Sequence, residues 1–250
     1  MTISDINFTT TRIEALLNSI VLGTGTGFFY KENSNEYLIT NRHVVIDEKE
    51  SYHPTSLRIR LHANRENLQL NNLIVVDLYD DNDRPSWLQH PAYSTLQCDV
   101  VAIPMRPPLL TGDNFSLFQR SSVTCFTKDL TEISDVNPFG DVVVLGYPLG
   151  FSDDVNNLPV YRHAMIASQF GVDFRGRPYF LVDANLHPGT SGSPVVSSHH
   201  TLFKEAGSKE GYKLFGIHSA EHIVDEEPLG LNVVWYSNLI PEIVVGDFIK

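Results

Sequence analysis

The chain has 250 residues, of which 42% are hydrophobic and 19% are charged, so it can bury a substantial core by itself. Its formal net charge of −12 repels phosphate backbones and anionic lipid, which argues against nucleic acid and membrane surfaces as partners. No apolar run approaches the ~18 to 20 residues that span a bilayer, and residues 1–19 lack the features of a signal peptide. We therefore expect a cytoplasmic protein.

The N-terminal segment carries a helical pattern, because apolar residues recur at Ile13, Leu16, Leu17, Ile20 and Val21. This spacing predicts a short helix within residues 1–22. Over residues 23–107, β-branched and aromatic residues instead form short clusters bounded by turn residues. The clusters cover residues 27–30, 37–41, 57–61, 73–78 and 99–103. We interpret them as antiparallel strands of a first β-barrel.

Residues 108–140 are interrupted by prolines and glycines and have weaker periodicity, which is typical of a connector. Strand patterns resume over residues 141–236, in clusters at 142–146, 163–170, 179–184, 193–197, 213–219 and 232–236. The sequence SNLIPEIVV then predicts a short C-terminal helix within residues 237–250. Because helical crossovers between the strands are missing, we expect an all-β fold of two small barrels with a cleft between them.

The segment HPGTSGSPV, residues 187–195, places Ser191 in a glycine-rich turn just before an apolar strand. Gly189 and Gly192 permit unusual backbone angles, and such a turn can expose a hydroxyl group. The amides of Gly189 and Ser191 can then converge on one point and form an oxyanion hole. A glycine- and serine-rich hairpin without catalytic function is the alternative interpretation of this motif.

His43 lies near the end of the segment YLITNRHVV, where we expect a strand to give way to a turn, and Asp99 leads into the aliphatic residues of CDVVAIP. An isolated carboxylate beside buried aliphatic residues is costly, so Asp99 needs a partner, and a histidine N–H is suitable. A serine hydroxyl becomes a good nucleophile when a base removes its proton and a third group orients that base. Although a lone histidine is usually structural, His43, Asp99 and Ser191 together fit a catalytic triad.

Five separated motifs carry a resemblance to a known family: GTGFF (25–29), ITNRHVV (39–45), CDVVAI (98–103), VVVLGYPLG (142–150) and DANLHPGTSGSPV (183–195). The chain resembles the chymotrypsin-like serine proteases, and specifically the protease domain of the bacterial high-temperature-requirement (HtrA) branch. The resemblance implies two antiparallel six-stranded β-barrels. It also implies that His43 is the general base, Asp99 its orienting carboxylate and Ser191 the nucleophile, with an oxyanion hole formed by the amides of Gly189 and Ser191.

That branch usually carries a PDZ domain after the protease, and we expect none here because the chain ends at Lys250. In the family, the residues before the nucleophile and those on the FGIHSA strand wall the specificity pocket, and here these are Leu186 and His218. A histidine at this place suggests cleavage after Glu or Gln, as in glutamyl endopeptidases. Those relatives usually have a threonine where this chain has Leu186, which fits small aliphatic side chains instead. The sequence therefore leaves both substrate specificities as alternatives, and a purely structural role for His218 is a third.

Two histidine pairs, His199 with His200 and His218 with His222, lack a third ligand at plausible spacing, so we expect no metal and no cofactor. The leading hypothesis is an endopeptidase that cuts protein or peptide substrates through an acyl-enzyme on Ser191. A cytoplasmic protease has to be restrained, and an activating partner protein is one means of doing so. A catalytically silent module that binds peptides in the same cleft is the rival hypothesis from another class.

Overall fold

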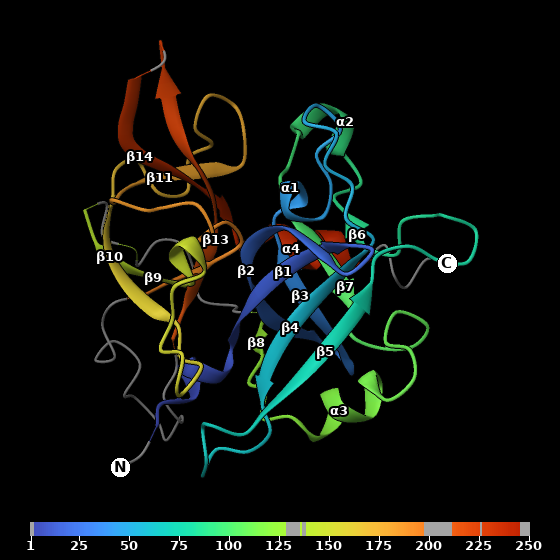
Figure 1. Cartoon of the computed structure of the whole chain (residues 1–250). Helices are drawn as coiled ribbons and strands as arrows, with labels where there is room; N and C mark the ends of the chain where they lie inside the picture. Colours follow the sequence, from blue (N-terminus) through green and yellow to red (C-terminus); the bar gives the residue numbers. More distant parts are fainter. Residues whose placement is uncertain (1–2, 129–135, 137–138, 198–211, 226, 246–250) are drawn as a thin grey trace.

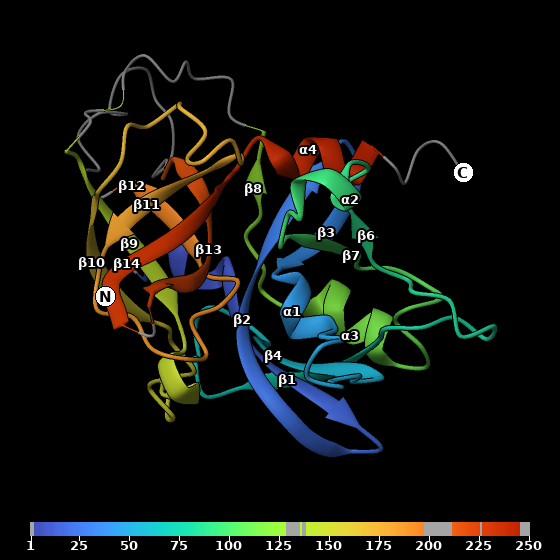
Figure 2. The same ribbon diagram turned by 90° about the horizontal axis from the view of Figure 1, so that it is seen from above.

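The computed structural model describes residues 3–128, 136, 139–197, 212–225 and 227–245. Two β-structures lie side by side, one built from the first half of the chain and one from the second (Figures 1 and 2). The all-β prediction is confirmed, and the helices are short. They are α1 (Arg42–Val45), α2 (Tyr93–Leu96), α3 (Asn114–Arg120) and α4 (Leu239–Val244), with 3-10 turns at Asp5–Phe8 and Pro148–Gly150.

The second half forms a closed six-stranded barrel in the order β10-β11-β14-β13-β12-β9, as the resemblance implied. Every neighbouring pair of its strands is antiparallel. The strands are β9 (Asp141–Gly146), β10 (Val160–Ile166), β11 (Tyr179–Asp183), β12 (Pro194–Ser197), β13 (Leu214–Val224) and β14 (Glu227–Tyr236). Buried residues alternate between the two faces of a strand: Phe180 and Val182 belong to the apolar cluster inside the barrel, whereas Tyr179 and Leu181 pack on its outer side in the cluster shared with the first half.

The first half forms an eight-stranded sheet in the order β5-β4-β1-β2-β3-β7-β6, and β8 pairs in parallel with β2. Its strands are β1 (Thr10–Leu17), β2 (Ile20–Glu32), β3 (Asn35–Thr40), β4 (Ser56–His62), β5 (Asn71–Asp77), β6 (Leu88–Gln89), β7 (Val101–Pro104) and β8 (Phe126–Thr127). The two strands beyond the expected six, β6 and β8, have two residues each. Sequence patterns miss strands this short, because they contain too few residues to show a period.

The helix predicted within residues 1–22 from the apolar spacing of Ile13 to Val21 is wrong, because this stretch forms β1, a hairpin turn and the start of β2. Asn18 and Ser19 both have positive φ angles, of 50° and 69°, as a two-residue hairpin turn requires. Ile13 is fully buried, whereas Ile20 beyond the turn is 67% exposed. The apolar residues that gave the helical spacing therefore lie on two different strands, with Ile13 on the buried face of β1 and Ile20 on an exposed face of β2.

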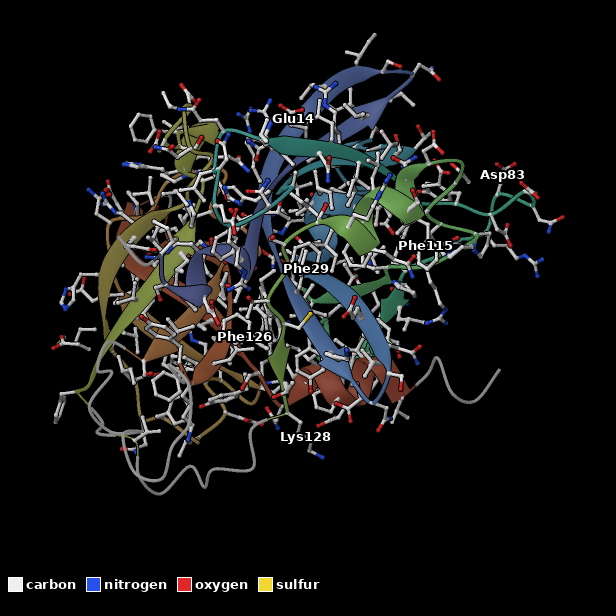
Figure 3. The ribbon with its side chains drawn as sticks, turned by 90° about the horizontal axis from the view of Figure 1, so that it is seen from below. Glu14, Phe29, Asp83, Phe115, Phe126 and Lys128 are labelled. Carbon is white, nitrogen blue, oxygen red and sulfur yellow. The ribbon has the colours of Figure 1, made fainter. Side chains whose placement is uncertain are left out.

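Three apolar clusters hold the fold together. One fills the first sheet around Phe29, which packs on Phe118 of α3 with ring centroids 5.9 Å apart, and a second fills the closed barrel. The third joins the two halves, since it contains Phe28 of the first sheet, Ile217 of the barrel and the buried face of α4. Figure 3 shows Phe126 of β8 alongside β2, where it meets Phe28 edge to face at 5.5 Å. The predicted C-terminal helix is confirmed as α4 up to Val244, and residues 246–250 lie outside the described residues.

Candidate active site

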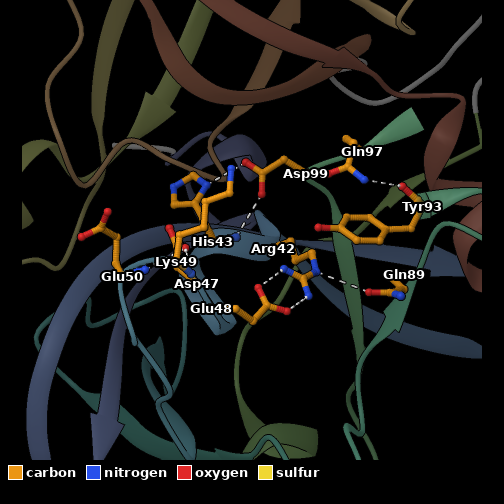
Figure 4. Close-up of polar contacts among 10 residues, drawn as sticks. All are labelled: Arg42, His43, Asp47, Glu48, Lys49, Glu50, Gln89, Tyr93, Gln97 and Asp99. Atoms are coloured by element: carbon orange, nitrogen blue, oxygen red, sulfur yellow. Dashed lines mark hydrogen bonds and ion pairs between the residues drawn. The ribbon is translucent and has the colours of Figure 1, made fainter. Parts of the chain in front are cut away.

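His43 and Asp99 are joined by two hydrogen bonds, where β3 ends and the neighbouring strand β7 begins (Figure 4). His43 lies in α1, one short turn after β3, and its Nδ1 is 2.7 Å from Oδ2 of Asp99. The backbone N–H of His43 donates to Oδ1 of the same carboxylate at 3.0 Å. Because an ionised carboxylate only accepts, Nδ1 carries the proton, and Nε2 of the neutral ring is left as an acceptor.

The backbone of Asp99 is fixed from the α1 side. The side-chain amide of Asn41 donates to the Asp99 carbonyl at 2.8 Å, and the amide of Arg42 donates to it at 3.3 Å. Arg42 in turn pairs with Glu48 through both of its terminal nitrogens and lies over the ring of Tyr93, 4.6 Å from its centroid. Figure 4 shows the pair of Arg42 and Glu48 beside His43 and Asp99. Together these contacts hold α1 against the segment that carries Asp99.

Ser219 is a further polar group at this carboxylate that the sequence analysis missed. Its hydroxyl donates to Oδ2 of Asp99 at 2.6 Å, and the residue lies on β13 of the barrel. Its only signal in the sequence was its place in the FGIHSA motif, directly after His218. Through Ser219, the second half of the chain contributes to the His43 and Asp99 pair.

Opposing effects act on the pKa of His43. Burial disfavours the imidazolium, but the hydrogen bond and charge of Asp99, with a smaller contribution from the charge of Asp47, outweigh it and raise the pKa above its usual value. The ring therefore accepts a proton more readily than a free imidazole does. A raised pKa of this origin is what a histidine needs to act as a base.

Ser191 lies in a turn that glycines on both sides make possible. Gly189 has a φ of +93° and Gly192 a φ of +86°. A Cβ on Gly192 would overlap the carbonyl oxygen of Thr26, and one on Gly189 would lie 2.7 Å from the carbonyl oxygen of Tyr147. The amide of Thr26 donates to the Ser191 carbonyl at 2.8 Å, so β2 of the first sheet holds the turn against the barrel.

The hydroxyl of Ser191 donates to the carbonyl of Ser219 at 3.0 Å. It makes no hydrogen bond to His43 within the residues that the structure describes. In the same described part of the chain, the backbone amides of Gly189 and Ser191 donate to no acceptor. Ser191 thus reaches the His43 and Asp99 pair through Ser219, and two amide donors beside it are unpaired.

His218 is 3% exposed, and both of its ring nitrogens face protein oxygens. Nδ1 is 3.0 Å from the carbonyl of Thr190, and Nε2 is 3.2 Å from Oδ1 of Asn232. Burial lowers the pKa of His218, so the ring is neutral. Leu186 is half-buried and packs against the apolar cluster of the closed barrel.

No group of three or more His, Cys, Asp or Glu side chains in the described ranges is arranged to hold a metal ion. His222 is half-buried and meets Phe174 edge to face, while His199 and His200 lie outside the described residues. Among the residues that the structure describes, no helix is long and apolar enough to cross a bilayer.

A family model described as a trypsin-like peptidase domain matches residues 25–203. No curated protein matches the sequence significantly. A mutant of Rv3671c from M. tuberculosis H37Rv, solved in an inactive form, is similar in fold, with a TM-score of 0.51 and 16% sequence identity. The similarity covers 98% of this chain and 88% of that chain. A serine endoprotease from Yersinia pestis has a TM-score of 0.54 and 15% identity, and the similarity covers 96% of this chain and 62% of that chain.

Proposed function

The chain belongs to the trypsin-like peptidase family and is a serine protease, and we propose that it is an endopeptidase with His43, Asp99 and Ser191 as its catalytic triad. The observation that carries this proposal is the double hydrogen bond from His43 to Asp99, with Nδ1 2.7 Å from Oδ2. This bond fixes the tautomer that leaves Nε2 free to take a proton.

In the proposed reaction, Nε2 of His43 takes the proton of the Ser191 hydroxyl while Oγ bonds to the scissile carbonyl carbon. The imidazolium, stabilised by Asp99, then protonates the leaving amine as the C–N bond breaks. Water attacks the resulting acyl-enzyme, giving its proton to His43, and Ser191 leaves with the proton that His43 returns. Atoms and charges balance with water as the second substrate, and the chemistry uses no cofactor.

The developing oxyanion needs donors that are not already in use. Among the described residues, the amides of Gly189 and Ser191 donate to no acceptor, which supports their assignment as the oxyanion hole. Loss of one such donor typically costs about 100- to 1000-fold in rate. Gly189 suits this role because the direction of its amide goes with a positive φ, a backbone conformation that glycine adopts freely and other residues adopt only with strain.

Ser191 has to exchange its hydrogen bond with Ser219 for one with His43 before it can react. Catalytic hydrogen bonds are often long or absent in the free enzyme and tighten when substrate binds. The exchange supports the proposal that a bound substrate, or an activating partner protein, promotes the reactive arrangement.

For the specificity pocket, we propose cleavage after small aliphatic residues rather than after Glu or Gln. Recognition of a substrate carboxylate by His218 requires a free N–H, but the one N–H of the neutral ring, at Nδ1, donates to the Thr190 carbonyl, and Nε2 carries no proton. The apolar side chain of Leu186 supports the aliphatic alternative.

A peptide library that varies the residue before the scissile bond tests this function. We expect cleavage products ending in Val, Ala or Ile from the wild-type protein and none from Ser191→Ala. Products ending in Glu or Gln would overturn the pocket assignment while leaving the triad intact. Equal cleavage by the wild type and Ser191→Ala would overturn the triad.

A further inference from the structure

A peptide unit couples the directions of two groups that belong to neighbouring residues. Because the unit is planar and trans, the carbonyl of one residue and the amide of the next point in opposite directions. A donor that fixes the carbonyl therefore also aims the amide. Within the nucleophile turn, this relation connects the Thr190 carbonyl to the Ser191 amide, and the Pro188 carbonyl to the Gly189 amide.

The Pro188 carbonyl accepts the backbone N–H of Leu149 at 2.6 Å, which aims the Gly189 amide away from Leu149. The Thr190 carbonyl accepts the amide of Ser193 at 3.0 Å and lies 3.0 Å from Nδ1 of His218. A carbonyl oxygen only accepts, so in this contact Nδ1 is the donor. His218 thus holds, by its side chain, the peptide unit that carries the Ser191 amide.

His218 is itself held firmly on β13. Its backbone amide donates to the Ser193 carbonyl, and its carbonyl accepts the amide of Gly192, both at 2.9 Å. On the far side of the ring lies Oδ1 of Asn232, whose own amide nitrogen donates to the Ala184 carbonyl at 2.7 Å. His218 and Asn232 are only 3% and 2% exposed, so the hydrogen bond from His218 to the Thr190 carbonyl is shielded from water. A shielded hydrogen bond is stronger than one in water.

We infer that His218 is a positioning residue of the active site: by donating Nδ1–H to the Thr190 carbonyl, it orients the Ser191 amide toward the oxyanion. This inference rests on the proposed function, because it assigns His218 to the oxyanion hole of that same reaction. It gives His218 a role in stabilising the transition state and none in selecting the substrate side chain.

Two conservative variants separate this role from a merely structural one. The side-chain nitrogen of asparagine is two bonds from Cβ, as Nδ1 is, whereas that of glutamine is three bonds away, as Nε2 is. His218→Asn therefore retains a donor for Thr190, whereas His218→Gln places its donor on the side of Asn232 and leaves the Thr190 carbonyl without it. Both variants keep a neutral polar side chain in the buried site.

We measure kcat and KM for one cleaved peptide and the affinity for a peptide boronic acid, whose tetrahedral adduct places an oxygen in the oxyanion hole. In His218→Gln we expect kcat to fall roughly 10- to 100-fold, less than for complete loss of a donor, with KM changed by less than about 2-fold. Affinity for the boronic acid falls in parallel. His218→Asn regains most of the lost kcat.

Equal kcat in His218→Gln and the wild type overturns the inference, as does an equal loss in both variants. A change in preference between Glu and Val before the scissile bond also overturns it, because that result assigns His218 to the pocket. Thermal unfolding checks that each variant folds. If His218→Gln does not fold, His218→Leu, which also lacks a donor for the Thr190 carbonyl, replaces it, with the same fall in kcat expected at constant KM and an unchanged kcat overturning the inference. A wild-type protein that cleaves no peptide and binds no boronic acid would instead refute the proposed function.

Discussion

The hydroxyl of Ser219 lies 2.6 Å from Oδ2 of Asp99, although 120 residues separate them in the chain. The carbonyl of Ser219 accepts the Ser191 hydroxyl, so one residue of β13 contacts the carboxylate with its side chain and the nucleophile with its backbone. These contacts bring residues of the first sheet and of the closed barrel to one place. The site exists because the two halves pack together.

Ser219→Ala removes the hydroxyl at Asp99 and keeps the backbone carbonyl. Asp99 then holds His43 with one fewer donor on its carboxylate, at a cost of about 1 kcal/mol. We expect kcat/KM for a peptide substrate to fall by roughly 3- to 10-fold. An unchanged kcat/KM would show that Ser219 does not contribute to holding the carboxylate.

The pH dependence of kcat/KM follows from His43, which must be neutral to act as a base. Because Asp99 and Asp47 raise its pKa above the ordinary value of 6.5, activity should fall as the pH drops through a value above 6.5. The same shift stabilises the fold below the unfolded-state pKa, and this contribution is lost as the pH rises through the folded pKa. If kcat/KM instead began to fall only below pH 6.5, that result would contradict the assignment of His43 as the base.

Asp99→Asn removes the charge that favours protonated His43 and presents an amide to its ring. Burial is then opposed mainly by Asp47, so we expect the acidic limb of kcat/KM to move to lower pH. Activity should fall on the order of 10⁴-fold, because the wrong tautomer is favoured. A variant with activity near that of the wild type would exclude Asp99 from the orienting role.

Gly192→Ala tests the geometry of the nucleophile turn, with Gly176→Ala as the matched control. Both glycines have positive φ, +86° and +72°, so both variants carry the backbone strain of roughly 1 to 2 kcal/mol. A Cβ at Gly192 would also overlap the Thr26 carbonyl, whereas one at Gly176 meets nothing within 4 Å. We expect Gly192→Ala to lower the melting temperature clearly more than Gly176→Ala. Equal melting temperatures would contradict the described turn.

The sequence predicts most of the strands, because the preference of β-branched and aromatic residues for strands depends on neighbours in the sequence and can be seen without the fold. It fails at residues 12–22, where a helical spacing was counted across a turn made by Asn18 and Ser19. It also misses Ser219 and Asn232, whose partners Asp99 and Ala184 are 120 and 48 residues away. A serine and an asparagine are common residues, and only their burial against a particular partner distinguishes them.

The most direct test of the triad is labelling of the purified protein with a fluorophosphonate, followed by intact mass measurement, since only an activated serine reacts readily. Ser193→Ala is the matched control, because Ser193 lies in the same turn but is fully buried. We predict one adduct on the wild type and on Ser193→Ala, and none on Ser191→Ala. An adduct that persists in Ser191→Ala, or its absence from folded wild-type protein, would contradict the assignment of Ser191 as the activated nucleophile.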